Sequence, residues 1–568
     1  MGGRILSFLF DRVMAEFDLP RFRQEFDASL HRNDLAAAAA LLEKHCSALL
    51  SHGRPQLFAH CVAAIPPRLQ AFYPRMMLAL AWRLIAQWHF SQVDDLLGAI
   101  RLRLAWLEQA GRDPVDILRL RRELKHREMM LALTQDDMPR AEELCRQLIG
   151  SRYRADSYVN GSLFTSLLHA RREQFKLSDV HMLDTQAADY HHAGGNQSAL
   201  IVHNALASLS LFALGRTGEA ADRLQETLET ARSIEEGAGP LAATAALPLA
   251  EILYERAAFD DARALVTDHM PRAYETGIVD QLISGCLTSA RLHRRAGDHR
   301  EAFEILDRAE LFAAKRGFRR LSAWALAERL GMLLQQGRLG TDREHGHALR
   351  STSVERHMPG PSVTTVGEAE ALAWAHMAEA HCRVEDGYRL AAAWGRRMRR
   401  EGAVRSRIRW NLVTLRFLLL AGETHKAARL LRETLAVAAK GSFLASFLDE
   451  PKVMEFLRSP HREGEATLNP DADALAARIL AADEGSASAA MPQGEDGPAT
   501  LGALSPREID VLTLAAAAWR NCDIAERLGL TEGTVKWYLQ QIYDKLGVRR
   551  RALAVDKARR FGIIGPPK

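Results

Sequence analysis

The stretch Thr531-Glu-Gly-Thr-Val-Lys-Trp-Tyr-Leu-Gln-Gln-Ile-Tyr-Asp-Lys-Leu-Gly547 has the features of one helix with a defined start and end. Thr531 is a good N-cap, because its hydroxyl can accept a hydrogen bond from a backbone N–H two or three residues on. Gly547 suits the C′ position, since glycine enters the left-handed conformation without steric cost. Apolar residues recur between these ends at Val535, Leu539, Ile542 and Leu546. This narrow stripe predicts a helix that packs on other helices along one face.

The opposite face of this helix is polar, and a second helix is predicted just before it. Lys536, Trp537 and Gln540 place a cation, an aromatic ring and an amide on the exposed face. Upstream, residues 521–529 form a shorter predicted helix that ends at Gly529. Two helices joined by a tight turn, with the second presenting polar side chains, are typical of the helix-turn-helix motif.

The module around this motif begins with a capping box. Ser505 is the predicted N-cap, Pro506 the first helical residue and Glu508 the N3 residue. Helices are predicted over 506–517, 522–528, 532–546 and 551–561.

Positive charge distinguishes this module from the rest of the chain. Residues 501–568 contain 12 Lys/Arg and 7 Asp/Glu and sum to +5, whereas the whole chain is +4, so residues 1–500 sum to −1. A basic module favours a polyanionic partner, and a merely solvated charged surface is the alternative.

Length and composition limit the remaining possibilities. A chain of 568 residues is too long for one core, so several domains or a repeat array are expected. No run approaches the roughly 20 apolar residues of a membrane span, and no secretory signal is recognisable, so we expect a cytoplasmic protein with no membrane partner. The cysteines contain no C-x-x-C pair and are predicted to be reduced thiols inside helices, with neither zinc nor disulfides. They are Cys46, Cys61, Cys145, Cys286, Cys382 and Cys522.

Residues 20–460 are predicted to be helical throughout and contain an internal repeat. A helix ends at a small residue, a polar turn follows, and an alanine occurs five residues after the small residue. This pattern occurs at positions 215, 257, 297 and 422, more weakly at Asp136, and Gly337 continues the spacing of 42, 40 and 40 residues. Repetition at about 40 residues predicts stacked helical hairpins, a solenoid whose concave face binds a peptide, protein or small ligand.

Two segments interrupt the helical pattern. His357–Ser362 breaks helicity within 338–367 and predicts a surface loop. Residues 483–500 are small, polar and acidic, which predicts a flexible linker after one short helix over 471–482. The predicted domains are a repeat domain over 1–465, a linker over 466–502 and a DNA-binding module over 503–568.

Four blocks of the module resemble the LuxR-type helix-turn-helix, namely Leu504–Glu508, Asn521–Gly529, Thr531–Lys536 and Ile542–Val548. In this family the third helix enters the major groove, so the resemblance implies double-stranded DNA as a partner. It implies base contacts from Lys536, Trp537 and Gln540, and backbone contacts from Asn521, Thr531, Thr534 and Arg549. It also implies a fourth helix that forms dimers through Ala552, Val555 and Arg559.

The module departs from the family pattern at three positions. Ala518 replaces the usual glycine, Tyr538 replaces a histidine, and Trp537 is unusually large, so the base preference cannot be transferred from the family. Trp537 either contacts DNA or packs on its own module. Lys536 binds either phosphate or guanine.

The repeat region resembles the sensor region of MalT-like regulators. The similar segments are Ala48–Leu57, Ile65–Pro67, Pro74–Trp82, Gly422–Ala427 and Phe443–Pro451. Such regulators normally carry an ATPase domain in front, but no G-x-x-x-x-G-K-[ST] occurs in this sequence. We therefore expect no ATPase domain in this chain and no cofactor.

Other features suggest no catalysis. The seven arginines within 396–409 form either a solvated hairpin or a site for an anion. Tyr190–Asn196 with His203 suggests a metal ligand set, but acidic companions seem to be missing from the sequence nearby, which favours a helix end followed by a turn. No nucleophile–base constellation is visible, so we expect no enzyme and no metal.

The sequence thus predicts an all-α protein, a tetratricopeptide-like α-solenoid followed by a four-helix helix-turn-helix domain. The predicted function is a DNA-binding transcription regulator. Its solenoid would sense a ligand or partner protein and control self-association on DNA, with RNA polymerase as a possible further partner. The alternative is an interaction scaffold with a vestigial or protein-binding C-terminal module.

Overall fold

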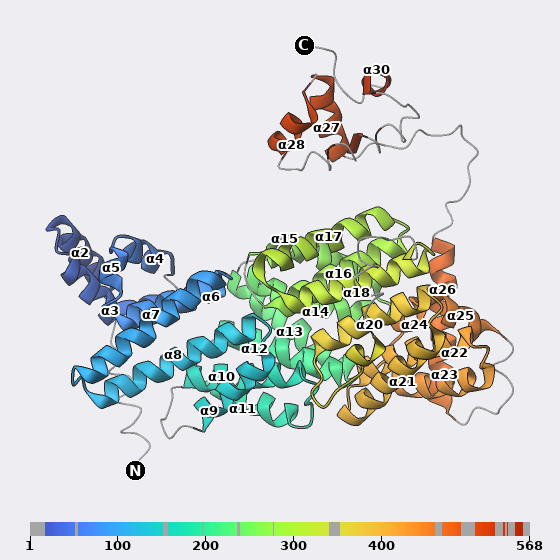
Figure 1. Cartoon of the computed structure of the whole chain (residues 1–568), viewed down its shortest axis with the longest axis horizontal. Coiled ribbons are helices and arrows are strands. Elements are labelled where there is room, and N and C mark those ends of the chain that lie inside the picture. The colour runs from blue at the N-terminus through green and yellow to red at the C-terminus, as the bar shows by residue number, and fades with distance from the viewer. Residues whose placement is uncertain are drawn as a thin grey trace. The chain divides into compact units, whose positions relative to one another are not determined.

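The computed structural model describes most of the chain as helices in two compact units, Met1–Ser488 and Ala489–Lys568 (Figure 1). The described residues are 18–51, 55–150, 157–195, 197–235, 239–275, 278–339, 353–459, 469–489, 506–517, 519–528, 535, 538, 539, 542 and 551–560. Within them no strand occurs, which confirms the all-α prediction. Among these residues, no helix combines the length and the apolar character that crossing a membrane requires.

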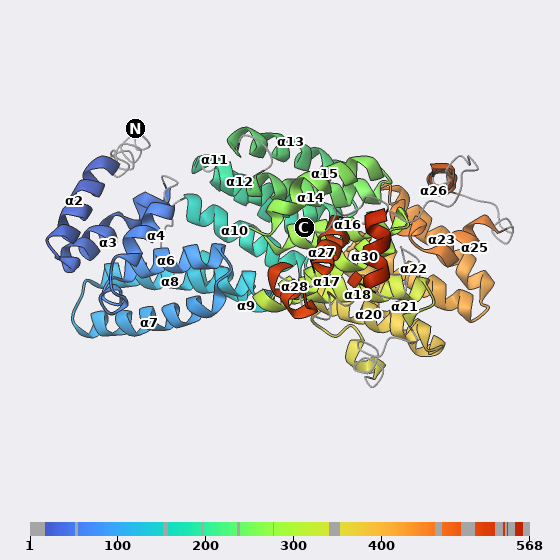
Figure 2. The same ribbon diagram turned by 90° about the horizontal axis from the view of Figure 1, so that it is seen from above.

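The first unit is a series of antiparallel hairpins. Figure 2 shows α2–α5 at one end of this unit and α21–α25 at the other. Its helices are α2 (Leu19–His31), α3 (Leu35–Ser51), α4 (Pro55–Ala63), α5 (Pro67–Gln70), α6 (Pro74–Ala86), α7 (Phe90–Gln109), α8 (Pro114–Thr134), α9 (Met138–Ile149), α10 (Ser157–Arg172), α11 (Val180–Ala193), α12 (Gln197–Ala213), α13 (Thr217–Glu235), α14 (Pro240–Glu255), α15 (Phe259–Ala273), α16 (Val279–Arg295), α17 (His299–Arg316), α18 (Arg319–Gln335), η2 (Val354–His357), α20 (Thr365–Ala380), α21 (Val384–Glu401), α22 (Val404–Leu420), α23 (Thr424–Ala439), α24 (Ala445–Leu448), α25 (Pro451–Arg458) and α26 (Pro470–Ala489).

One turn geometry recurs through the whole solenoid. The turn residue has a positive φ, its N–H donates to the carbonyl three residues back, and the next N–H donates to the carbonyl five residues back. These bonds satisfy the last carbonyls of the first helix of each hairpin. The turn residues are Asn33, Trp88, Asp136, Phe175, Gly215, Ala257, Gly297, Gly337, Cys382 and Gly422. The predicted repeat is confirmed, and it also includes hairpins that the sequence pattern did not reveal.

The hairpins missed by the sequence have large residues at the turn. Trp88 and Phe175 are each 3% exposed. The Trp88 ring lies edge-on to Phe312 and Phe318, with centroids 5.8 and 5.3 Å away. A left-handed conformation costs a non-glycine residue about 1–2 kcal/mol. Burial of an aromatic ring offsets this cost, so tertiary packing stabilises turns that local sequence does not predict.

The position five residues after each turn residue is where the paired helices approach most closely. Ala141, Ala220, Ala262, Ala302 and Ala427 are all fully buried there, as the sequence pattern predicts. In the hairpin that begins at Cys382 this position is Gly387, where an added Cβ would lie 2.1 Å from Phe417.

Hairpins far apart in the sequence also contact one another directly. Arg316 donates to the carbonyls of Gln87 and Trp88 at 3.1 and 3.2 Å. The N–H of Thr365 donates to the carbonyl of Glu173 at 3.0 Å, and that of Leu444 to Glu255 at 2.9 Å. These partners are more than 180 residues apart, so successive turns of the superhelix touch, and each turn covers part of the surface of another.

Three expectations need correction or refinement. Residues 470–489, placed in the flexible linker over 466–502, form helix α26, whose stripe of Ala472, Leu475, Ala476 and Ile479 is buried against the repeats. Cys382 lies exposed in a turn rather than inside a helix. The predicted loop is non-helical over 358–364, and it is held by a bond from Trp394 Nε1 to the carbonyl of His357 at 2.9 Å.

The second unit contains α27 (Pro506–Ala516), α28 (Asn521–Leu528) and α30 (Arg551–Arg560). These agree with three of the four helices predicted for the module. Of the fourth, predicted over 532–546, the structure describes Val535, Tyr538, Leu539 and Ile542, and all four are helical.

Candidate nucleic-acid interface and buried charge networks

The C-terminal unit is built around one small apolar core. Val535, Leu539 and Ile542, from the stripe that the sequence indicated, are at most 5% exposed. They pack with residues from the other helices, which are Val511, Leu512 and Ala515 of α27, Ile524 and Ala525 of α28, and Ala554 and Ala558 of α30. The apolar face of the predicted third helix is therefore turned inward.

Most of the predicted DNA contacts lie outside the described residues. These are Thr531, Thr534, Lys536, Trp537, Gln540 and Arg549. Asn521 is described and is the first residue of α28, with a half-buried side chain. Of the predicted dimer residues on α30, Val555 and Arg559 are half-buried, and the side chain of Ala552 is not described. Leu553, which the sequence analysis did not select, is 52% exposed on the same helix.

Arg551 connects three parts of this unit. Its Nη2 donates to the carbonyls of Ala515 and Trp519, at 3.0 and 2.5 Å, and its Nη1 donates to Oδ1 of Asn521 at 3.3 Å. It therefore satisfies carbonyls after α27 and holds the first residue of α28. The sequence analysis missed Arg551, because nothing local indicates that the first residue of α30 reaches back to the α27–α28 turn.

The contact with Arg551 determines which way the Asn521 amide faces. An arginine side chain has only donors, so the amide oxygen must point toward it. The amide N–H₂ then points away from Arg551 and can donate to a phosphate, as expected for a backbone-contacting residue at the start of a helix.

Replacing Asn521 by aspartate tests this orientation. Asn521→Asp keeps the oxygen that accepts from Arg551 but replaces the N–H₂ donor with a charged oxygen. We expect an unchanged melting temperature and an affinity for DNA about 10- to 100-fold weaker, since a charge-assisted hydrogen bond contributes about 1.5–3 kcal/mol. Fluorescence anisotropy with duplex DNA measures the affinity. Asn521→Ala should lose less affinity, because it removes the donor without adding negative charge; native affinity in Asn521→Asp would contradict the assignment.

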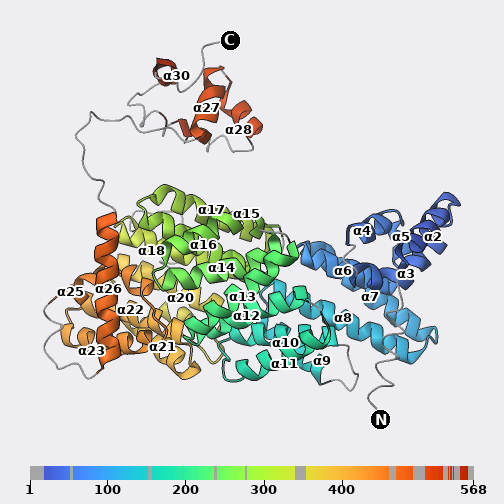
Figure 3. The same cartoon turned by 180° about the vertical axis from the view of Figure 1, so that it is seen from behind.

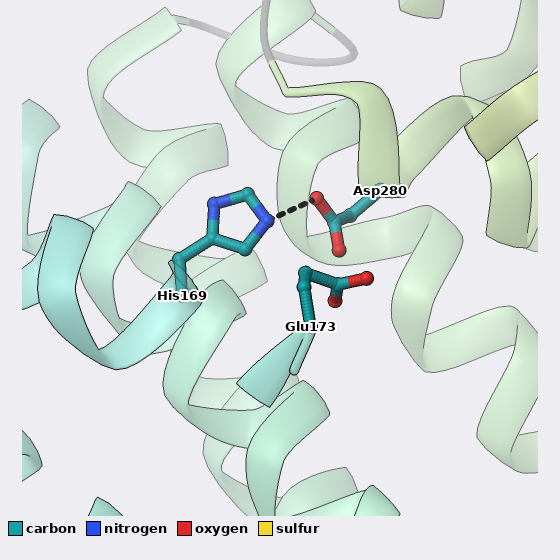
Figure 4. A group of neighbouring side chains, drawn as sticks. All are labelled: His169, Glu173 and Asp280. Atoms are coloured by element: carbon teal, nitrogen blue, oxygen red, sulfur yellow. Dashed lines mark ion pairs between the residues drawn. The ribbon is translucent and has the colours of Figure 1, made fainter. Parts of the chain in front are cut away.

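In the first unit, a buried polar cluster joins distant hairpins (Figure 4). His169, Glu173 and Asp280 each offer an atom within 4.8 Å of the others. His169 Nε2 lies 3.2 Å from Asp280 Oδ2. Carboxylates and imidazole at such spacing could hold a metal ion, but two guanidiniums occupy the same place.

Arg172 and Arg320 neutralise this cluster. Arg172 pairs with Glu173 and Asp280, and Arg320 Nη1 lies 2.9 Å from Glu173 Oε2. Arg320 also pairs with Asp136 at 2.6 Å. Burial raises the pKa of Asp280, but attraction by Arg172, Arg320 and His169 outweighs it and holds the pKa well below its usual range. We therefore interpret the cluster as an ion-pair network that joins α10, α16, α18 and the α8–α9 turn.

The arginine-rich segment is divided between inside and outside. Arg405 pairs with the buried Glu251, and Arg409 lies 3.0 Å from the buried Glu368. Arg397 donates to the carbonyls of Gly360 and Pro361 at 3.1 and 2.8 Å. These three arginines therefore hold the solenoid together, which neither alternative considered from the sequence included.

The histidines that suggested a metal site form a hydrogen-bonded cluster. Thr165 Oγ1 lies 3.0 Å from His191 Nε2 and 3.0 Å from His203 Nδ1. His203 Nε2 lies 3.0 Å from Asp184, which also pairs with Arg223 at 2.8 Å. The predicted helix end and turn are confirmed at Ala193–Gly195. The expectation that acidic companions are missing is wrong, because Asp184 comes from an earlier part of α11.

Comparison with known proteins defines the class first. Residues 502–558 match the family model of bacterial regulatory proteins of the luxR family, and residues 126–459 match the model of the MalT-like TPR region. The chain is thus an all-helical repeat protein of a transcription-regulator class with a LuxR-type DNA-binding domain. Because the second match covers more than half of the chain, the chain belongs to the MalT-like TPR family.

Curated relatives agree with this assignment. The HTH-type transcriptional regulator AlkS of Pseudomonas putida is 23% identical over 447 residues, 76% of this chain and 48% of AlkS. The probable transcriptional regulatory protein SgaR of Hyphomicrobium methylovorum is 47% identical over 55 residues, 10% of this chain and 26% of SgaR. The HTH-type transcriptional activator RamA of Corynebacterium glutamicum is 44% identical over 61 residues, 11% of this chain and 22% of RamA. The chain spans about half or less of these relatives.

Proposed function

We propose that this protein binds double-stranded DNA through its C-terminal unit and regulates transcription in response to an effector that acts on the solenoid. The luxR-family match over 502–558 carries the proposal. The described helices support it, since α27, α28 and the helical residues between 535 and 542 share one apolar core. The basic charge of this unit favours DNA over an uncharged partner.

Self-association is part of the proposed mechanism. Two modules would place two helices of 531–547 in successive major grooves, with half-sites about one helical turn, ~10 bp, apart. Lys536, Trp537 and Gln540 would face bases, and dimers would form through α30. Because dimerisation raises the effective concentration of the second module, the assembly state can switch DNA binding.

The contacts between distant hairpins are where we propose that an effector acts. Asp449 after α24 pairs with Arg294 and Arg295 of α16, at 2.6 and 3.2 Å. Glu450, the next residue, pairs with Arg416 of α22 at 2.8 Å. A ligand or partner protein that competes for these groups would change how the superhelical turns pack. Such a ligand shifts the population of solenoid conformations only as far as it binds one conformation better.

A salt titration of the full chain with DNA tests the proposed function. The probe is a duplex enriched by the protein from a random pool. If each module neutralises roughly five phosphates, log K should fall with log salt with a slope of about −4 to −5 per module. Lys536→Ala should weaken binding and reduce this slope by about 1, whereas Lys125→Ala on α8 should change neither. Absence of salt-dependent binding by the native chain would reject the regulator function and favour the scaffold.

A further inference from the structure

A segment of the solenoid is more basic than the C-terminal unit. Residues 396–440 contain 12 Lys/Arg and 3 Asp/Glu, a net charge of +9. Because the whole chain is +4, all other residues together sum to −5. Dividing the charge at residue 500 therefore conceals a second basic region, which lies on α21, α22 and α23. Figures 1 and 3 show these three helices as neighbours at one end of the first unit.

The positive charges on the outside of these helices gather around one carboxylate. Glu433 of α23 lies 2.6 Å from Arg407 and 3.5 Å from Arg399. Arg399 is 68% exposed, whereas Arg407 is only 18% exposed and already neutralises Glu433. We define the α21–α23 basic face as Arg396, Arg399, Arg400 and Arg429.

Helix geometry places these arginines close together. Arg396 is three and four residues before Arg399 and Arg400, so all three lie on one side of α21. Arg429 is four residues before Glu433 on α23 and therefore neighbours the same carboxylate. Among the described residues, no carboxylate pairs with Arg396, Arg400 or Arg429. Like charges at this spacing disfavour the helix, so internal stability does not account for the cluster.

The face lies beside the point where the chain leaves the solenoid. Arg478 of α26 donates to the Ser442 hydroxyl at 3.3 Å, just after α23 ends. The stripe of α26 is buried in the same apolar cluster as Leu431 and Leu435 of α23. Helix α26 ends at Ala489 and α27 begins at Pro506, so 16 residues connect the units. Even fully extended they span only about 55 Å, which keeps DNA held by the C-terminal unit near this end of the solenoid.

We propose that the α21–α23 basic face contacts the phosphate backbone of DNA next to the site bound by the C-terminal unit. Exposed guanidiniums bind phosphate through paired, charge-assisted hydrogen bonds. The tether supplies the local concentration that makes a weak second contact effective. The contact carries no base readout, so it strengthens binding to any flanking sequence. The inference rests on the proposed function, because it requires DNA at the C-terminal unit.

The test uses the full chain and two duplexes. The short duplex, of about 30 bp, is enriched by the protein from a random pool, and the long duplex adds about 20 bp of arbitrary sequence on each side. The face variant changes Arg396, Arg399, Arg400 and Arg429 to glutamine. A matched control makes the same change at four exposed arginines elsewhere on the solenoid, Arg23, Arg68, Arg140 and Arg263.

For the native chain, we expect a salt slope steeper by about 3–4 on the long duplex than on the short one, since four phosphates contribute about 0.9 each. The face variant should show one slope on both duplexes and bind the long duplex at least 10-fold more weakly than the native chain does. The control variant should behave like the native chain. Equal native slopes on both duplexes, or a native slope in the face variant, would overturn the inference and leave an acidic protein as the partner of this face. Failure of the native chain to bind even the short duplex would instead reject the proposed function, and this inference with it.

Discussion

Replacing Arg320 by alanine is expected to lower the free energy of unfolding of the repeat unit by about 3–5 kcal/mol. Arg320 is 2% exposed and pairs with Asp136, Glu173 and Asp280. Without it, three buried carboxylates share one guanidinium, that of Arg172. The cost comes from the charges left without a partner rather than from the pairs lost. Urea unfolding followed by circular dichroism measures the change.

Two further variants separate this effect from general loss of charge. Arg300→Ala removes a partly exposed pair with Glu304 on one helix and should cost at most about 1 kcal/mol. Arg320→Lys keeps the charge but offers fewer donors in a fixed plane, so its effect should fall between those of the two alanine variants. If Arg320→Ala and Arg300→Ala were equally stable, the network would not hold the hairpins together. Because the folded pKa of Asp280 is depressed, its contribution is present above pH 3.8 and is lost as the pH falls through that lower value.

Mild acid is expected to destabilise the repeat unit through its buried histidines. Burial, together with the neighbouring Arg127, lowers the pKa of His126 to about 3. Burial, with His203 beside it, lowers the pKa of His191 to about 4. Between these values and the ordinary pKa of 6.5, the unfolded chain binds protons that the folded chain does not, so stability falls as the pH falls. Each histidine contributes up to about 1.4 kcal/mol per pH unit in this window. Urea unfolding at pH 7, 6 and 5 measures the total slope.

His191→Gln tests the contribution of one histidine. Glutamine can still bond to Thr165 but does not titrate, so the dependence between pH 5 and 6 should decrease by roughly 1 kcal/mol per pH unit. A larger ring would not fit, because a Cβ at Gly161 would already lie 2.7 Å from the His191 ring. His425→Gln, at an exposed position on α23, should leave the pH dependence unchanged. An unchanged slope in His191→Gln would show that this histidine is protonated in the folded protein.

Short-range patterns in the sequence were reliable wherever the structure depends on neighbouring residues. The apolar stripe of Val535, Leu539 and Ile542 predicted a helix with one buried face, and these residues are buried. Turns at Gly215 and Gly297 were predicted because glycine favours the left-handed conformation that the turn requires. Helix α26 was underestimated because its small, acidic composition masked an apolar stripe that is visible once the period of 3.6 is applied.

Tertiary structure alone decided what the charged residues do. The sequence shows Arg396, Arg397, Arg405 and Arg409 as one basic run, but Arg405 and Arg409 face buried glutamates from α14 and α20, and Arg396 faces outward. Arg405 and Glu251 are 154 residues apart. By itself, the sequence therefore determined the helices, the repeat and the DNA-binding module, because each follows from periodicity over a few residues. Which charges pair and which stay exposed depends on how the superhelix brings distant hairpins together, and no local pattern records that geometry.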